Sequence, residues 1–170
     1  MLSRGCEEHP SSDHQGNQVM PRFAAGRVFE IPLNEDGAAY GLMLARFPYF
    51  AFYLADSIDK AMRVQRPPAD DPLFTVSVYR SAYSTGRWNG PLYQVREELP
   101  GIPSFFRQNV MHPDDCEIVD ATGNTRAATP DECIGLERSA VWSAENIEER
   151  LGDRRAGRPD EHVRSMMLKL

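Results

Sequence analysis

The stretch Leu73-Phe-Thr-Val-Ser-Val-Tyr-Arg-Ser-Ala-Tyr-Ser-Thr-Gly-Arg-Trp88 joins the clearest strand pattern in the chain to its most distinctive turn. Apolar and hydroxyl-bearing side chains alternate along it, with Phe74, Val76 and Val78 on one face and Thr75, Ser77 and Tyr79 on the other. A period of two with β-branched residues favours a half-buried strand over a short helix. We expect the remaining elements to pack around this strand.

Three more strands are predicted before it. Residues 27–33 alternate, with Phe29, Ile31 and Leu33 on one face, and Asn34-Glu35-Asp36-Gly37 supplies an Asp-Gly hairpin turn. The return strand covers residues 39–46, where Tyr40, Leu42 and Leu44 share a face. Residues 49–54 are almost continuously apolar, which is typical of a strand covered on both sides. Together these segments predict an antiparallel meander.

Shorter elements are predicted before and after the central strand in the sequence. Asp56 or Ser57 can cap a helix over residues 58–64, and a proline-rich connector then leads to Pro72. Beyond Trp88 we predict a short strand at 92–95, an edge strand at 104–108, and a hairpin of strands 116–119 and 125–127 around a five-residue loop.

Two helices are predicted near the C-terminus. Thr129-Pro130-Asp131-Glu132 has a capping residue, a proline at the first helical position and a glutamate three residues after the cap. Cys133, Leu136 and Ala140 would form the inner face of that helix. Ser143 caps a second helix over residues 144–151, which we expect to end at Gly152. The predicted fold is therefore α+β: a strongly bent antiparallel sheet, which could close as a small SH3-like barrel, with C-terminal helices packed on it.

Length and composition favour one soluble domain. The chain has 170 residues, 41% hydrophobic and 26% charged, and no apolar run approaches the roughly 20 residues of a membrane span. We expect a disordered leader at residues 1–20, a single domain at 21–152 and a basic tail at 153–170. The leader carries acids and histidines where a secretory signal has an apolar core, so we expect a cytoplasmic protein with no membrane partner. Three sparse cysteines agree with a reducing compartment.

Charge argues against a nucleic-acid partner. The formal net charge is −6, whereas nucleic-acid binding depends on Lys and Arg neutralising phosphates. Between His112 and Glu149, ten acids stand against two arginines, a local balance of −8. Such a field could speed the encounter with a basic protein, although an inert solvated surface is the more common explanation.

The residues offer little catalytic equipment. His112 and Cys116 are four apart with Cys133 as a distant third, which falls short of the four ligands of a structural zinc site. A cysteine nucleophile activated by His112 is conceivable, yet no local signature supports it. No phosphate-binding glycine loop is present. We therefore predict neither an enzyme nor a bound cofactor or metal.

Aromatic and arginine residues mark candidate contacts with a protein partner, because these residue types are enriched at interface anchors. Trp88 is better explained as a core residue that plugs a barrel end, and Trp142 as a core residue between helices. The residues that we predict to contact a partner are Asp114, Asp115, Asp131, Glu132, Glu137, Arg87, Phe105 and Arg107.

An ordered series of short motifs runs through the chain. The motifs are Gly26-Arg27-Val28-Phe29-Glu30-Ile31-Pro32-Leu33, Ala39-Tyr40-Gly41, Leu73 to Val78, Ser84-Thr85-Gly86-Arg87-Trp88, Phe105-Phe106-Arg107-Gln108, Ala128-Thr129-Pro130-Asp131-Glu132-Cys133, Gly135-Leu136-Glu137-Arg138 and Ala140-Val141-Trp142. This series resembles the immunity protein 26 family of bacterial polymorphic toxin systems. The resemblance spans residues 26–151 and excludes the leader and the tail.

The resemblance implies a small cytoplasmic protein that binds and neutralises a cognate toxin domain by stoichiometric occlusion. Residue chemistry leaves two alternatives open. One is a module that binds a small ligand or peptide, since barrel mouths and aromatic clusters also form ligand sites. The other is a hydrolase that uses Cys116 or Cys133 with His112.

Overall fold

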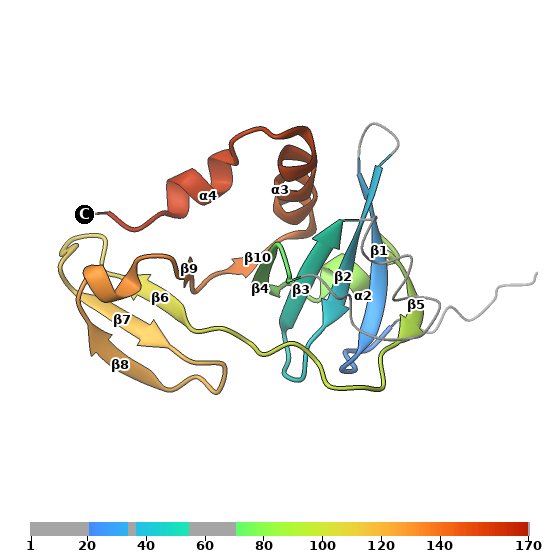
Figure 1. Ribbon diagram of the computed structural model, residues 1–170, viewed down its shortest axis with the longest axis horizontal. Helices are drawn as coiled ribbons and strands as arrows, with labels where there is room; N and C mark the ends of the chain where they lie inside the picture. The colour runs from blue at the N-terminus through green and yellow to red at the C-terminus, as the bar shows by residue number, and fades with distance from the viewer. Residues whose placement is uncertain (1–20, 34–36, 55–70, 170) are drawn as a thin grey trace, which may run out of the picture.

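The computed structural model describes residues 21–33, 37–54 and 71–169, which form two β-sheets and a few helices (Figure 1). The large sheet has the strand order β10-β4-β3-β2-β1-β5. Its strands are β1 (Arg27–Leu33), β2 (Gly37–Met43), β3 (Tyr49–Leu54), β4 (Phe74–Val78), β5 (Asn89–Gln94) and β10 (Val141–Trp142). The small sheet has the order β8-β7-β6-β9. Its strands are β6 (Phe105–Gln108), β7 (Cys116–Val119), β8 (Thr125–Ala128) and β9 (Glu137–Arg138).

The predicted meander is confirmed. Strands β1 to β4 pair antiparallel in sequence order, and β10 pairs parallel to β4 at one edge. Strand β4 therefore lies between two partners, β3 and β10. Thr75, on the face that we expected to be polar, is also buried. The strand at 92–95 is confirmed as β5, which begins slightly earlier and pairs with β1.

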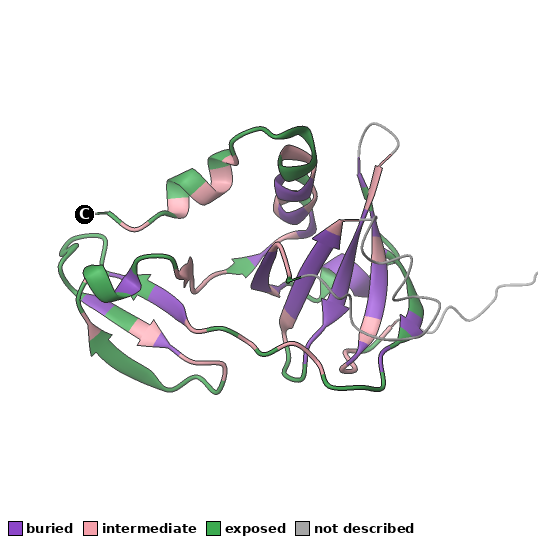
Figure 2. Ribbon diagram, viewed as in Figure 1, coloured by how far each residue is buried: buried purple, intermediate pink, exposed green. Residues whose placement is uncertain are grey.

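Both faces of the large sheet are covered, because its strands alternate between two apolar clusters. One face buries Phe29, Ile31, Phe50, Phe52, Val76 and Trp88 together with Ile147 and Leu151 of helix α3 (Ala144–Ala156). The other face buries Val28, Leu42, Leu44, Ala51 and Tyr53. Leu99 and Ile102, in the connection to the small sheet, pack against this second cluster. Figure 2 shows the resulting contrast between the buried strands of the large sheet and the exposed strand β8.

The small sheet lies beside the large one and is joined to it by residues 95–104 (Figure 1). The ring of Phe105 stacks on Tyr49 of β3, with ring centroids 5.3 Å apart. The predicted hairpin is confirmed as β7 and β8. Strand β6, which we expected at an edge, instead lies between β7 and β9.

The helix predicted after Thr129 is wrong beyond its first turn. The capping box forms, since the Thr129 N–H donates to Glu132 at 2.8 Å and the Glu132 N–H donates to Thr129 Oγ1 at 3.4 Å. Only the 3₁₀ turn η1 (Asp131–Cys133) follows. Ile134 is extended and Gly135 has φ +82°, so the chain turns away and pairs as β9 with β6. Trp142 accordingly lies on strand β10 and not between helices.

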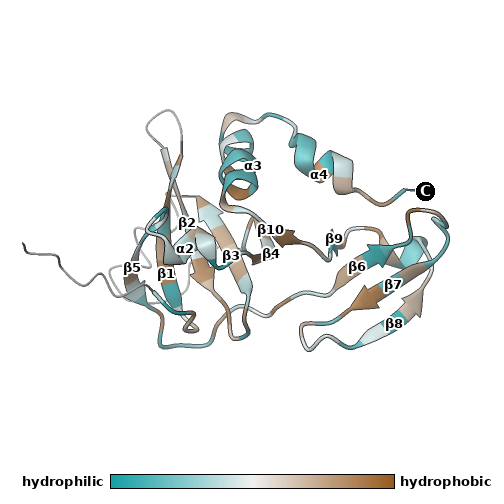
Figure 3. Cartoon of the chain, turned by 180° about the vertical axis from the view of Figure 1, so that it is seen from behind, coloured by the Kyte–Doolittle hydropathy of each residue, from teal (hydrophilic) through white to brown (hydrophobic). Residues whose placement is uncertain are grey.

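Helix α3 (Ala144–Ala156) begins as predicted at Ser143, whose hydroxyl accepts from the Asn146 N–H. It does not end at Gly152, because Gly157 with φ +66° provides the C-terminal cap. Helix α4 (Glu161–Met166) follows, and helix α2 (Ser81–Ser84) fills the turn after β4. In Figure 3 much of α3 is hydrophilic, which agrees with a helix that buries one narrow stripe.

The α+β class is confirmed, whereas barrel closure is wrong. Both sheets are open, and each contains one parallel pair in addition to its antiparallel pairs. Trp88 is a core residue as expected, with 1% of its surface exposed, but it packs under a sheet and not in a barrel end. The predicted leader, the turn at 34–36 and the helix at 58–64 lie outside the described residues.

Candidate partner-binding surface

Several residues that we predicted to contact a partner have structural partners within the chain. The Arg87 guanidinium forms two hydrogen bonds to the Glu148 carboxylate, at 2.8 and 2.7 Å, and an ion pair with Glu145. These contacts hold the turn after α2 against helix α3. The side chain of Arg87 is still 40% exposed. Phe105 is only 2% exposed, so it offers little area to a partner.

Glu137 belongs to a buried ionic cluster around Arg150. The side chain of Arg150 is 3% exposed and contacts the carboxylates of Glu137 and Asp160. Its guanidinium also lies 3.8 Å from the centroid of the Phe74 ring. The cluster therefore ties α3 to β9, to β4 and to the N-cap of α4, a role that sequence spacing gave no signal for.

The acids between residues 112 and 149 fall into two groups. Five of them contact a cationic side chain or a histidine: Glu132 with Arg126, Glu137 with Arg150, Glu145 and Glu148 with Arg87, and Glu149 with His162. The other five form no ion pair with any described residue, and they are Asp114, Asp115, Glu117, Asp120 and Asp131. All five of these acids lie on the small sheet or in its connections.

Local hydrogen bonds keep some of these carboxylates ionised. Hydrogen bonds from Thr122 and then from Asn124 lower the pKa of Asp120 to about 2. The backbone N–H of Thr129 and the Arg126 guanidinium lower the pKa of Glu132. The negative charges of Asp120 and Glu132 therefore persist well below neutral pH.

Exposed apolar side chains occur near Asp114, Asp115 and Asp131, at one end of the small sheet. Val110 and Met111, in the connection between β6 and β7, are 75% and 81% exposed, and Ile134 after η1 is 61% exposed. Met167, beyond α4, is 59% exposed. Val110 lines one hollow, and Ile134 and Met167 line another; the two hollows share Arg138 and Met166.

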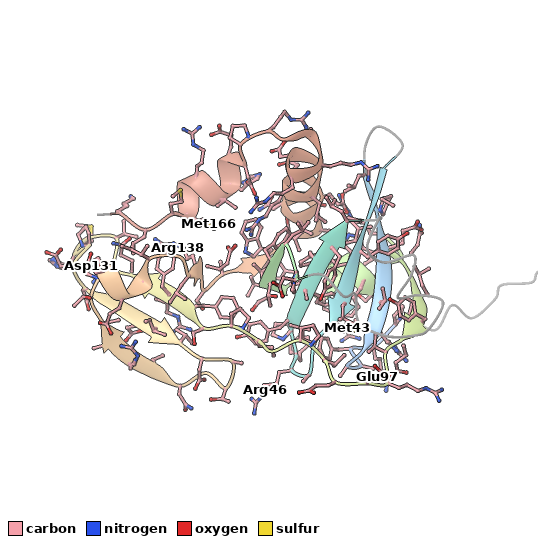
Figure 4. The ribbon with its side chains drawn as sticks, viewed as in Figure 1. Met43, Arg46, Glu97, Asp131, Arg138 and Met166 are labelled. Atoms are coloured by element: carbon pink, nitrogen blue, oxygen red, sulfur yellow. The ribbon has the colours of Figure 1, made fainter. Side chains whose placement is uncertain are left out.

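We call this end of the molecule the distal surface and define it by Val110, Met111, Asp114, Asp115, Asp131, Ile134 and Met167. Cys116 and Cys133 pack in one cluster under it, which holds the Asp114 and Asp131 segments side by side. Figure 4 shows Asp131 at this end of the molecule and Glu97 below the large sheet. Of the predicted contact residues, Asp114, Asp115 and Asp131 lie here, while Arg107 is exposed on β6. The apolar pair Val110-Met111 within a polar turn was the sequence signal that we missed.

The cysteines have the environment of structural residues. Cys116 and Cys133 are 2% and 1% exposed, and the Cys116 thiol donates to the Pro113 carbonyl at 3.5 Å. Burial, followed by the neighbouring Cys116, raises the pKa of the Cys133 thiol, which disfavours the reactive thiolate. Among residues 21–33, 37–54 and 71–169, no group of three or more metal-ligating side chains could hold an ion.

A firm α+β scaffold that exposes apolar side chains among unpaired acids is typical of a protein-binding domain. Comparison with known families agrees: the sequence model of immunity protein 26 matches residues 24–117. The match covers more than half of the chain, so this protein belongs to the immunity protein 26 family. No curated protein and no solved structure matches it.

The family match covers the meander, β5, β6 and the start of β7. The motifs from Ala128 to Trp142, which also contributed to the resemblance, lie beyond it. Family membership indicates a proteinaceous partner and a binding role. In the described part of the chain, no helix combines the length and the apolar character needed to cross a bilayer.

Proposed function

We propose that this protein binds a cognate bacterial toxin domain one to one in the cytoplasm and occludes its active site or substrate channel. Membership of an immunity-protein family supports a toxin as the partner. The observation that carries the proposal is the coincidence of exposed apolar side chains and unpaired acids on the distal surface. The buried thiols support binding over catalysis by cysteine.

The distal surface has the two properties that a protein interface needs. Its apolar side chains lose contact with water on binding and so contribute affinity. Its acids form no ion pair with the residues that the structure describes, and residues 105–133 carry six acids against two arginines. A toxin with a basic surface would be attracted over a distance of about 10 Å at moderate salt. Arg107, on β6 of the same sheet, would contact the toxin at the edge of this interface.

Electrostatic attraction makes a prediction about association rates. Replacing Asp114 and Asp115 with lysine should slow association with the cognate toxin domain by about tenfold, because charge steering raises association rates by this order or more. The melting temperature should not change, since exposed turn charges contribute little stability. Surface plasmon resonance at low and high salt measures both the rates and their salt dependence.

The matched control is the reversal of Glu97 and Glu98, two adjacent exposed acids in the connection after β5. Figure 4 labels Glu97. It changes the net charge equally and should leave association unchanged. If both reversals slow association alike, or if neither does, the distal surface does not steer the toxin. If no complex forms with the parent chain, the proposed function itself is wrong.

A further inference from the structure

An apolar groove of about 300 Å³ lies between α4 and the segment that connects η1 to β10. Its lining includes Phe106, Cys133, Leu136, Trp142, Val163 and Met166. Arg138 and Met166 lie near each other between β9 and α4 (Figure 4). A groove of this size can accommodate a large side chain or a small ligand.

Polar contacts hold α4 above this groove without filling it. No residue of α4 is buried. The Arg138 Nε–H donates to the Met166 carbonyl at 2.9 Å. The Gln108 side chain donates to the Lys169 carbonyl at 2.6 Å and accepts from the Lys169 N–H at 2.9 Å. Val163 and Met166 of α4 also pack, partly buried, against the core cluster of the large sheet. Polar and apolar contacts together therefore hold α4 in place, and the groove lies between it and the segment before β10.

The groove has one cation and an apolar mouth. The Arg138 guanidinium lies 5.0 Å from the centroid of the Phe106 ring and has no ion-pair partner among the described residues. The neighbouring Glu137 is already paired with Arg150. Ile134 and Met167, both more than half exposed, stand at the mouth and belong to the distal surface.

We propose that this groove receives one large apolar side chain of the toxin domain, next to which a carboxylate or carbonyl oxygen accepts a hydrogen bond from Arg138. The inference rests on the proposed function and adds how the complex is anchored. The acids of the distal surface attract a basic toxin domain, and the groove then buries the large apolar side chain of that domain. Charge complementarity favours this occupant, because the groove combines apolar walls with a cation, Arg138, that has no ion-pair partner among the described residues.

The groove can be tested first without the toxin. The fluorescent probe 1-anilinonaphthalene-8-sulfonate combines an aromatic body with an anionic group, which matches the apolar walls and Arg138. The full chain should bind it saturably. Ile134→Asp, which adds a negative charge at an exposed position of the mouth, should weaken this binding about tenfold or more, within the range found for altered apolar pockets. Leu92→Asp, at an exposed apolar position on β5, is the matched control and should not.

Competition between the probe and the toxin domain then tests whether the toxin domain occupies the groove. Adding the toxin domain should displace the probe, and Ile134→Asp should weaken toxin binding about tenfold or more. Val163→Trp, which fills the groove from α4, should do the same, with a thermal melt to show that it is folded. A complex that forms without displacing the probe, or that tolerates Ile134→Asp, overturns the proposal that the groove anchors the toxin domain. It leaves the proposed function unaffected. A chain that shows no saturable probe binding also overturns the proposal about the groove. A toxin domain that does not bind at all overturns both.

Discussion

Replacing Arg150 with alanine is expected to lower the free energy of unfolding by about 3 to 5 kcal/mol, the cost of removing one partner from a buried ion pair. The guanidinium contacts Glu137 and Asp160 and lies over the Phe74 ring. Its loss would leave two carboxylates poorly compensated, with side-chain exposures of 29% and 13%. Urea denaturation of the parent and the variant measures the difference.

The control for this prediction is Arg154→Ala, an exposed arginine on the same helix, which should change stability by no more than about 0.5 kcal/mol. Arg150→Met combined with Glu137→Gln should recover part of the loss, since apolar replacement of both members of a buried pair is often tolerated. If Arg150→Ala is as mild as Arg154→Ala, the ionic cluster does not hold the C-terminal segment in the fold.

Trp88→Ala is expected to lower the free energy of unfolding by a similar amount, about 3 to 5 kcal/mol, because it removes a large buried ring from the core. Trp88 packs edge-on against Phe50 and Phe52, with ring centroids 5.8 and 6.0 Å apart. Its indole N–H also donates to Glu148 at 3.0 Å. Thermal and urea melts should both shift.

Trp88→Phe separates the two contributions of this residue. It keeps an aromatic ring and loses the hydrogen bond, so its cost should be clearly smaller than that of Trp88→Ala. A Trp88→Ala protein that melts like the parent but no longer binds the toxin domain would contradict the core role and make Trp88 a contact residue.

The meander could be predicted because local pattern and tertiary structure agree there. Residues 27–33 and 74–78 alternate at period two, and each face of the sheet meets its own apolar cluster. Ser143 predicted the start of α3 for the same reason, since an N-cap is a local interaction. Where a short-range signal and the packing agree, sequence is sufficient.

The segment between Ile134 and Trp142 could not be predicted because long-range pairing overrides local signals there. The capping box at Thr129 forms, yet pairing of β9 with β6 and of β10 with β4 takes the chain out of the helix. Both pairings are parallel and join residues more than 30 positions apart, which no window of sequence reveals. The stretch at 153–169, expected to be a tail, contributes the end of α3 and the α4 contacts for similar reasons.

The negative charge of the candidate surface could be predicted from the sequence, but the pairing of its individual acids could not. The acidic excess between His112 and Glu149 is visible in the sequence, but only the structure separates paired acids from unpaired ones. Glu132 and Glu137 are bound to Arg126 and Arg150, while Asp114 and Asp131 have no such partner among the described residues. Opposite charges that meet across elements cannot be inferred from their positions along the chain.

The most direct test of the proposed function is a titration of toxin activity. The purified cognate toxin domain is mixed with increasing amounts of the full chain, and its residual activity is measured at a toxin concentration far above the dissociation constant. We expect activity to fall linearly and to vanish at one equivalent, with Asp114 and Asp115 reversal slowing inhibition. Activity that persists beyond several equivalents, or inhibition that proceeds catalytically below one equivalent, would contradict stoichiometric occlusion.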